Sequence, residues 1–200
     1  MVSAPSLPDS AYVPASATPV KVLVAGHFGV GKTTLVGSVS EIVPLRTEER
    51  ITTASAAVDD LTGRKEKTTT TVAMDFGRIT LEPVDVVLYL FGLPGQERFW
   101  PVTKELMQGA RGAVLMADTR SLERTFPVAD YLEECGVPYA VALNEFEGAH
   151  RFELEDVRTA LDLKPETPLV WCDARKGSSC KETLVTLFKY LAALSTPEHS

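Results

Sequence analysis

The 200-residue sequence predicts an α/β domain with a mainly parallel sheet and helices on both faces. Two observations support this prediction. Short apolar runs rich in β-branched residues recur along the chain, and segments in which apolar residues have helical spacing lie between them. Because strands that alternate with helices usually form a parallel sheet covered on both sides, the pattern is typical of this fold class.

The strands are expected where the apolar runs are short. The first run, Val20–Ala25, stops at Gly26, as a buried strand does. Four later runs share this character. Another run is longer and alternates, which is typical of a strand with one face toward water. These later strands are predicted over residues 84–91, 112–117, 139–143 and 168–172, with the alternating one over 72–81.

The clearest predicted helix lies near the C-terminal end of the sequence, and another is expected over residues 154–161. Ser179 and Glu182 are three positions apart, which is typical of a capping box at a helix start. Five large apolar residues then share one helical face: Leu184, Leu187, Phe188, Leu191 and Leu194.

Composition indicates one globular domain, which we expect over residues 20–196. Residues 1–19 are mostly Ala, Pro, Ser and Thr, so they predict a disordered tail. The net charge of −7 argues against nucleic-acid binding. Since no apolar run reaches the roughly 18–20 residues of a membrane span, and no signal peptide or lipidation motif is evident, we expect a cytoplasmic protein without a direct membrane anchor.

The segment Gly26–Thr33 matches the pattern G-x-x-x-x-G-K-[ST] in full, directly after a predicted strand and before a helix. Glycines let the backbone curl so that several N–H groups converge on phosphate oxygens, and the positive end of the following helix points at the same place. Lys32 would neutralise the outer phosphates, and the Thr33 hydroxyl would bind Mg²⁺. The segment therefore predicts a P-loop nucleotide site.

Further polar or glycine positions closely follow other predicted strands. In a parallel sheet, ligands bind beyond the carboxyl ends of the strands. We therefore expect the chemistry to gather at one edge of the sheet, near Gly26, Gly92, Asp118, Asn144 and Asp173.

From Val20 to Leu194 the chain resembles a Ras-like small GTPase, because four further segments follow in the order and spacing of that family. Thr71–Phe76 resembles the end of switch I and the next strand, and Gly95–Phe99 resembles the start of switch II. Asn144–Glu147 lies where the guanine-reading N-K-x-D box is expected. Cys172–Arg175 lies where the last base-binding loop is expected.

The resemblance implies roles for individual residues. Thr71 would bind Mg²⁺ and the γ-phosphate, the Gly95 amide would contact that phosphate, and Gln96 would orient the attacking water. Thr71 is chosen among the threonines at 68–71 because the T-x-x-x-D-F register places it. The implied catalytic residues are Lys32, Thr71 and Gln96, and the implied Mg²⁺ ligands are Thr33 and Thr71. The implied nucleotide contacts are Gly29, Val30, Gly31, Lys32, Thr33, Thr34, Gly95, Asn144, Glu147, Asp173 and Ala174.

Three residues depart from the Ras-like pattern. Gly92 stands where the D-x-x-G box has its Asp, Glu147 replaces the base-reading Asp, and Glu145 replaces the Lys that packs on the base. Phe146 would offer an apolar surface instead.

The missing Asp resembles the bacterial GTPases similar to the gliding-motility protein MglA, and the segments N-x-F-[DE]-G and C-D-A-R resemble actinobacterial conservon-type GTP-binding proteins. These resemblances imply a cytoplasmic, Mg²⁺-dependent switch that binds GTP and GDP and hydrolyses GTP slowly. Its implied partners are a roadblock/LC7-type regulator and a sensor-kinase-like protein.

Several alternatives stay open. A P-loop ATPase or small kinase would need an acidic residue at the end of a strand, for which Asp118 is a candidate. A degenerate scaffold would bind nucleotide without hydrolysis, or bind none. Residues 44–70 show little apolar periodicity and fit either a switch I loop or a plain insertion. Phe99 and Trp100 fit either partner anchors or packing of switch II onto the sheet.

Overall fold

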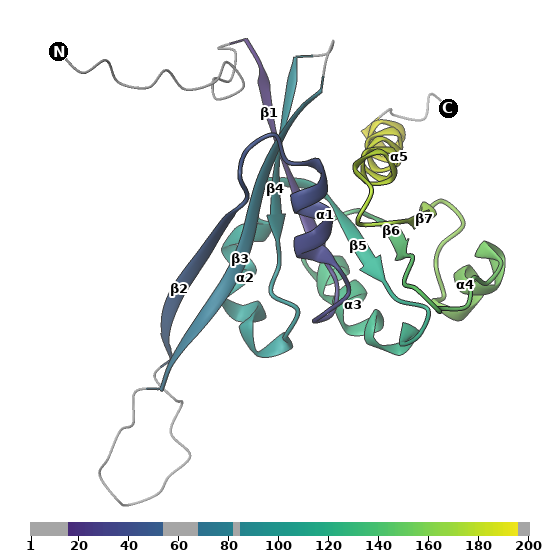
Figure 1. Cartoon of the computed structure of the whole chain (residues 1–200), viewed down its shortest axis with the longest axis horizontal. Helices are drawn as coiled ribbons and strands as arrows, with labels where there is room; N and C mark the ends of the chain where they lie inside the picture. The colour runs from purple at the N-terminus through teal and green to yellow at the C-terminus, as the bar shows by residue number, and fades with distance from the viewer. Residues whose placement is uncertain (1–15, 54–67, 82–84, 196–200) are drawn as a thin grey trace, which may run out of the picture.

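The computed structural model describes residues 16–53, 68–81 and 85–195, and in these ranges seven strands form one sheet (Figure 1). The strands are β1 (Thr18–Ala25), β2 (Leu45–Thr53), β3 (Thr68–Leu81), β4 (Val86–Gly92), β5 (Ala110–Ala117), β6 (Tyr139–Asn144) and β7 (Leu169–Cys172). Their order is β2-β3-β4-β1-β5-β6-β7, with β3 antiparallel to both neighbours and all other pairs parallel. The predicted α/β fold class is confirmed.

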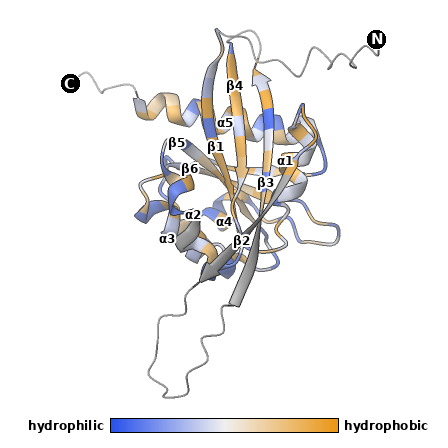
Figure 2. Cartoon of the chain, turned by 90° about the vertical axis from the view of Figure 1, so that its left-hand side faces the viewer, coloured by the Kyte–Doolittle hydropathy of each residue, from blue (hydrophilic) through white to orange (hydrophobic). Residues whose placement is uncertain are grey.

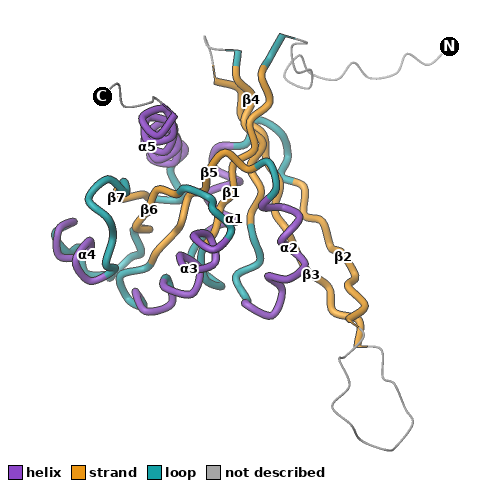
Figure 3. The backbone as a smooth tube through the Cα atoms, turned by 180° about the vertical axis from the view of Figure 1, so that it is seen from behind, coloured by secondary structure: helices purple, strands orange, loops and turns teal. Residues whose placement is uncertain are grey.

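Helices cover both faces of the sheet, as expected. α1 (Lys32–Val39) and α5 (Gly177–Ser195) pack on one face, and α2 (Trp100–Met107), α3 (Phe126–Glu134) and α4 (Leu154–Ala160) lie on the other (Figure 3). Two short 3-10 turns, Glu97–Phe99 and Leu122–Arg124, precede α2 and α3. Within the described ranges, no helix combines the length and the hydropathy needed to cross a membrane.

The alternation of side chains along β1 shows why two helical layers are needed. Val22 and Val24 belong to the core beneath α1 and α5, whereas Leu23 and Ala25 belong to the core beneath the opposite helices. All four residues are fully buried. Successive strand residues point to opposite faces, so a strand that is apolar at every position requires cover on both sides. Figure 2 shows mostly apolar colouring along β4.

Two predicted boundaries are wrong. The first strand begins at Thr18 rather than Val20, so the end of the expected tail is folded, while residues 1–15 lie outside the described part of the chain. α5 begins at Gly177, which puts Ser179 inside its first turn. The Ser179 hydroxyl accepts a hydrogen bond from the Asp173 N–H at 3.0 Å, so it ties the helix to the preceding loop and is not the residue that caps it.

Much of the segment 44–70 is strand, which differs from the expected loop. β2 pairs with the first half of β3 as an antiparallel ribbon, from Leu45 opposite Phe76 to Thr53 opposite Thr68. Residues 54–67, between the two strands, lie outside the described ranges. The strands here are rich in Thr, Arg and Glu, of which only Thr favours strands, so their pairing forms the ribbon without an apolar pattern. Because β3 meets β4 only from Asp75 onward, the ribbon projects past the carboxyl end of β4 (Figure 1).

Trp100 packs against the domain. Its ring stacks on Tyr131 of α3 with 4.6 Å between ring centroids, and the Tyr131 hydroxyl donates to the Trp100 carbonyl at 2.8 Å. Phe99 is half-buried and lies beneath the Arg98 guanidinium, 4.7 Å from ring centroid to Cζ. The contacts of Trp100 therefore favour packing of this segment onto the domain over a free anchor.

Candidate functional site

The carboxyl ends of four strands meet at one edge of the sheet, as the sequence predicts. β1 leads into the glycine-rich loop at Gly26, and β4 ends at Gly92. β6 ends at Asn144, and β7 leads into Asp173. Since all of these strands run parallel, the loops that follow them lie on the same side of the molecule.

Lys32 is buried beneath the glycine-rich loop. Its ammonium donates hydrogen bonds to the carbonyls of Gly26 and His27, each at 2.8 Å. Burial lowers the pKa of Lys32 to about 8, and the nearby Asp75 carboxylate opposes that shift. The two carbonyls hold the ammonium under the loop, in the position from which a P-loop lysine reaches phosphate.

Asn144 links two loops that are distant in sequence. Its Nδ2 donates to the Val30 carbonyl at 2.9 Å, and its Oδ1 accepts from the Ala174 N–H at 3.1 Å. The close approach requires glycine at position 31, where a Cβ would lie 2.5 Å from Nδ2 and where φ is 107°. One buried side chain therefore sets the distance between the P-loop and the loop that follows β7.

A cavity of about 370 Å³ lies between these loops. It brings together six of the residues that the resemblance implies as nucleotide contacts, from the P-loop, from α1 and from the ends of β6 and β7. They are Gly29, Gly31, Thr34, Asn144, Glu147 and Ala174.

Arg120 and Phe146 form part of the wall of this cavity. The Arg120 guanidinium carbon lies 3.8 Å from the centroid of the Phe146 ring, and Nη2 donates to the Asp118 carboxylate at 2.7 Å. Burial by itself would raise the pKa of Asp118, but the hydrogen bonds from Arg120 outweigh it and lower the pKa. Sequence reasoning considered Asp118 and Phe146 and missed Arg120, whose only signal is its position two residues after a strand-end acid.

The Asp173 carboxylate binds two basic side chains of its own loop. Its carboxylate accepts hydrogen bonds from Arg175 Nε at 2.8 Å and pairs with Lys176 Nζ at 3.0 Å. The Arg175 guanidinium holds the pKa of Asp173 well below its usual range. Asp173 is not among the residues that line the cavity, whereas its neighbour Ala174 is.

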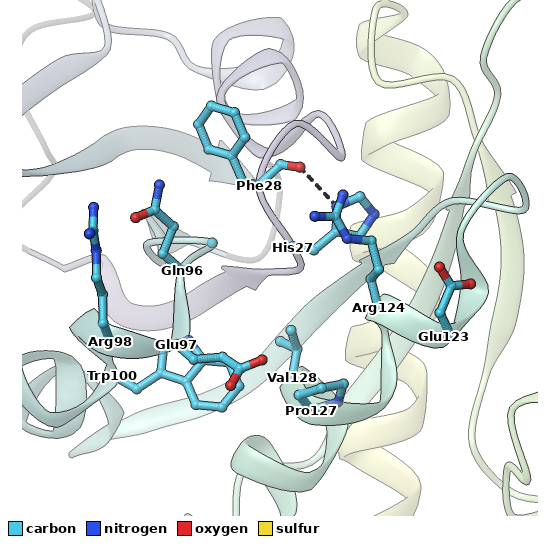
Figure 4. A pocket seen from close by; sticks show the side chains of 11 residues that line it. His27, Phe28, Gln96, Glu97, Arg98, Trp100, Glu123, Arg124, Pro127 and Val128 are labelled. Carbon is cyan, nitrogen blue, oxygen red and sulfur yellow. Dashed lines mark hydrogen bonds between the residues drawn. The ribbon is translucent and has the colours of Figure 1, made fainter.

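The segment that begins at Gly95 lies directly against the P-loop. A Cβ on Gly95 would be 2.5 Å from the Phe28 nitrogen and 2.8 Å from Lys32 Nζ, so only glycine fits there. A second cavity, of about 620 Å³, opens beside this contact between the P-loop and α3. Figure 4 shows Gln96 and Phe28 on one side of it and Arg124 on the other. Both Gln96 and Phe28 are exposed there.

His27 lies at the base of this second cavity and is buried. Its Nδ1 is 2.8 Å from the Phe28 carbonyl, so Nδ1 carries the proton and donates (Figure 4). Burial is the main cause that lowers the pKa of His27. A neutral imidazole held by the loop backbone supports a structural role for this residue.

Thr33 meets a carboxylate that sequence reasoning did not select. Its hydroxyl donates to Asp75 Oδ2 at 2.5 Å. Hydroxyl and carboxylate oxygens are the ligand types that Mg²⁺ prefers, so this pair fits the metal implied by the P-loop motif. The T-x-x-x-D-F register was a signal that could have found Asp75.

The structure does not bring Thr71 to the same place. Thr71 lies within β3 with its backbone opposite Arg50, four residues before Asp75. At about 3.3 Å per strand residue, its Cα is about 13 Å from that of Asp75. The side chain of Thr71 lies outside the part of the structure that is described, so its role as a Mg²⁺ ligand stays a prediction.

Solved structures share this fold. The cytosolic domain of the T. maritima FeoB iron transporter, in a GDP form, superposes with a TM-score of 0.63 at 17% identity, over 88% of this chain and 65% of that structure. This chain therefore spans just under two thirds of that structure. The separate G domain of the same transporter gives a TM-score of 0.61 at 18% identity, over 86% of this chain and 99% of that one.

Sequence comparisons point the same way. An uncharacterized protein of Methanocaldococcus jannaschii is 27% identical over 128 residues, which are 63% of this chain and 70% of that protein. The model of a family described as "conserved hypothetical ATP binding protein" matches residues 24–193, from the end of β1 to the last turns of α5. With a P-loop, a G-domain fold and this match along most of its length, the chain belongs to that family of P-loop NTPases.

Proposed function

We propose that this protein binds guanine nucleotides with Mg²⁺, hydrolyses GTP slowly and acts as a switch toward protein partners. The observation that carries the proposal is the cavity in which P-loop residues share one space with Asn144 and Glu147. A nucleotide whose phosphates lie on the P-loop would place its base in this cavity.

Glu147 is the residue that would read the base. Its carboxylate can accept hydrogen bonds from the two adjacent N–H donors on the guanine edge. Adenine presents a ring-nitrogen acceptor there, so the carboxylate would face it without a proton between them. A site built around such hydrogen bonds can reject the wrong partner by about 10⁴-fold to 10⁵-fold. Phe146, stacked under Arg120, offers an apolar surface beside the base.

The phosphates would lie over the loop backbone and Lys32. Backbone N–H groups and the start of α1 supply positive potential, and the Lys32 ammonium would exchange a carbonyl partner for a phosphate oxygen. Mg²⁺, when bound, would neutralise charge on the outer phosphates. Among the side chains, Thr33 would bind Mg²⁺. Thr71 would become a second ligand only after movement of the β2–β3 ribbon.

The contact between Gly95 and Lys32 supports a switch. A Cβ added at Gly95 would lie 2.8 Å from the ammonium, so the start of switch II is close to Lys32, and a terminal phosphate there would enter the space between them. Binding of GTP would then displace the start of switch II, and loss of the phosphate would let it return. Gln96, next in sequence and exposed beside the P-loop, would orient the attacking water.

The similar structures and the family description name different nucleotides. The neighbouring FeoB structures include a GDP form and a GMPPNP form, which support guanine. The family description names ATP, so adenine is the second candidate, and Asp118 would then be its strand-end acid. Since Asp118 is already paired with Arg120, its geometry supports guanine better.

The finer class that we propose is the MglA-like and conservon-type group of bacterial GTPases, because Gly92, Phe146 and Glu147 fit its departures from Ras. Partners would then be a roadblock/LC7-type regulator and a sensor-kinase-like protein in the cytoplasm. The net charge of −7 speaks against nucleic acid as a partner.

Calorimetric titration of nucleotide-free protein with GDP, GTPγS and ADP, each with Mg²⁺ and with EDTA, tests the proposal. We expect tight binding of GDP and GTPγS and at least 100-fold weaker binding of ADP, in keeping with readout by hydrogen bonds. Equal affinity for ADP would overturn the guanine assignment, and no binding of any nucleotide would favour a scaffold.

A further inference from the structure

The absence of an acidic residue at Gly92 leaves the Mg²⁺ site of a Ras-like protein without its usual carboxylate. In this structure another carboxylate lies at that place. Asp75 of β3 is the residue directly opposite Gly92 of β4 in the antiparallel register. Two side chains at such a pair point to the same face of the sheet, so they share one region of space.

The geometry around Gly92 shows how closely the two positions coincide. A Cβ added at Gly92 would lie 3.1 Å from the Asp75 Cβ and 3.3 Å from Asp75 Oδ2. A side chain at position 92 would therefore enter the volume that the Asp75 carboxylate occupies. Replacing an acid by glycine on β4 leaves room for the acid on β3.

The Asp75 carboxylate also has the partner expected of a metal-site acid. Its Oδ2 accepts the hydrogen bond from Thr33, the P-loop hydroxyl that would bind Mg²⁺. It is close enough to Lys32 to raise the pKa of that ammonium against the effect of burial. In the described ranges, no three His, Cys, Asp or Glu side chains gather as a metal site, so a cation here would take further ligands from phosphate and water.

We infer that Asp75 supplies the carboxylate of the Mg²⁺ site in place of the residue missing at Gly92. Thr33 and Asp75, from α1 and β3, then form the protein's share of that site. The inference rests on the proposed binding of a nucleotide with Mg²⁺, and it concerns which strand provides the acid.

The test compares the GDP affinity of the full chain in Mg²⁺ with that in EDTA. Asp75→Asn keeps an oxygen that can accept from Thr33 but removes the charge, so it separates a metal role from a purely structural hydrogen bond. We expect Mg²⁺ to tighten GDP binding to the unmodified chain, and this effect to fall by about 10-fold to 100-fold in Asp75→Asn. Affinity in EDTA should stay within threefold, and Asp130→Asn, an exposed acid on α3, should behave as the unmodified chain does.

The transposed variant Asp75→Gly/Gly92→Asp moves the carboxylate back to β4. Since Gly92 has no positive φ and removal of the Asp75 side chain frees the space, we expect this variant to recover most of the Mg²⁺ effect. A third measurement needs no substitution. With Mn²⁺, GDP and chain labelled with carboxyl-¹³C aspartate, electron–nuclear double resonance should detect a ¹³C coupling to the metal.

The outcomes separate this inference from the proposed function. If the unmodified chain binds GDP more tightly with Mg²⁺ and Asp75→Asn keeps the full effect, Asp75 is not the metal-site acid and the proposed function stands. If Asp75→Asn unfolds, absence of the ¹³C coupling in the unmodified chain overturns the inference, and its presence supports it. If the unmodified chain does not bind GDP, both fall together.

Discussion

Asn144 donates a buried hydrogen bond to the carbonyl of Val30, and the two residues are 114 positions apart in the sequence. The same side chain accepts from Ala174, so Asn144 joins the P-loop to the loops that follow β6 and β7. Both hydrogen bonds are buried, so loss of the side chain would leave a carbonyl and an N–H without partners. This makes Asn144 a residue on which the stability of the fold depends.

For Asn144→Ala we expect a loss of about 2–4 kcal/mol in the free energy of unfolding, because each buried unsatisfied group costs about 1–3 kcal/mol. Urea denaturation with a constant m-value measures it. Lys189→Ala, at an exposed position on α5, is the control and should stay within about 0.5 kcal/mol. A loss below 0.5 kcal/mol in Asn144→Ala would show that the link is not structural.

The lowered pKa of Lys32 leads us to expect that GDP binding depends on pH. Its pKa in the free protein is about 8, and phosphate would raise it, so binding requires a protonated ammonium. Affinity should fall about fourfold between pH 7 and pH 8.5. Stability without nucleotide should change the other way: the folded state disfavours the charge, so the free energy of unfolding rises as pH increases from about 8 toward 10.5.

Titrations of GDP at several pH values measure the first effect, and pH-dependent urea denaturation measures the second. Lys32→Arg provides the control, since a guanidinium does not lose its proton in this range. Its residual GDP affinity should be independent of pH. A wild-type affinity that is flat up to pH 8.5 would contradict the prediction.

The proposed role of Glu147 in reading the base leads to a prediction about the preference for GDP over ADP. Removing its carboxylate in Glu147→Ala takes away the acceptors for the guanine edge, so GDP affinity should fall by about 100-fold or more while ADP affinity changes little. Competition of GDP and ADP against a fluorescent nucleotide gives the ratio directly. Glu153→Ala, an exposed acid just before α4, should leave the ratio unchanged. If Glu147→Ala also leaves it unchanged, another group reads the base.

The proposed role of Gln96 in orienting the attacking water leads to a prediction about the rate of GTP hydrolysis. In Gln96→Ala the attacking water loses its orienting group, and single-turnover GTP hydrolysis should slow by about 100-fold. Binding of GTPγS should stay within threefold, because the exposed side chain lies beside the phosphate loop and outside the base cavity. Gln108→Ala, on the surface after α2, is the matched control. Equal rates for Gln96→Ala and the unmodified chain would remove Gln96 from the reaction.

The strands and the P-loop could be predicted because their signals are local. β1 and β4–β7 are short apolar runs ended by polar residues or glycine, and the loop motif lies between a strand and a helix. Since residues a few positions apart decide these conformations, one sequence was enough to predict them. Polar β2 lacks that signal, because its strand character comes from pairing with β3.

The site was only partly predictable, because some of its residues depend on contacts between segments that are distant in sequence. Asn144 and Lys32 were found through motifs that fix spacing along the chain. Asp75 and Arg120 were missed because their importance comes from neighbours on other strands and loops: Gly92 and Thr33 for the first, Phe146 for the second.

By itself the sequence determined an α/β domain with a phosphate loop at the carboxyl edge of its sheet, because hydrophobic alternation and glycine placement act over a few residues. Only the tertiary structure decided which carboxylate lies beside the Thr33 hydroxyl. That choice depends on the register between β3 and β4, where a one-residue shift would turn Asp75 to the other face of the sheet.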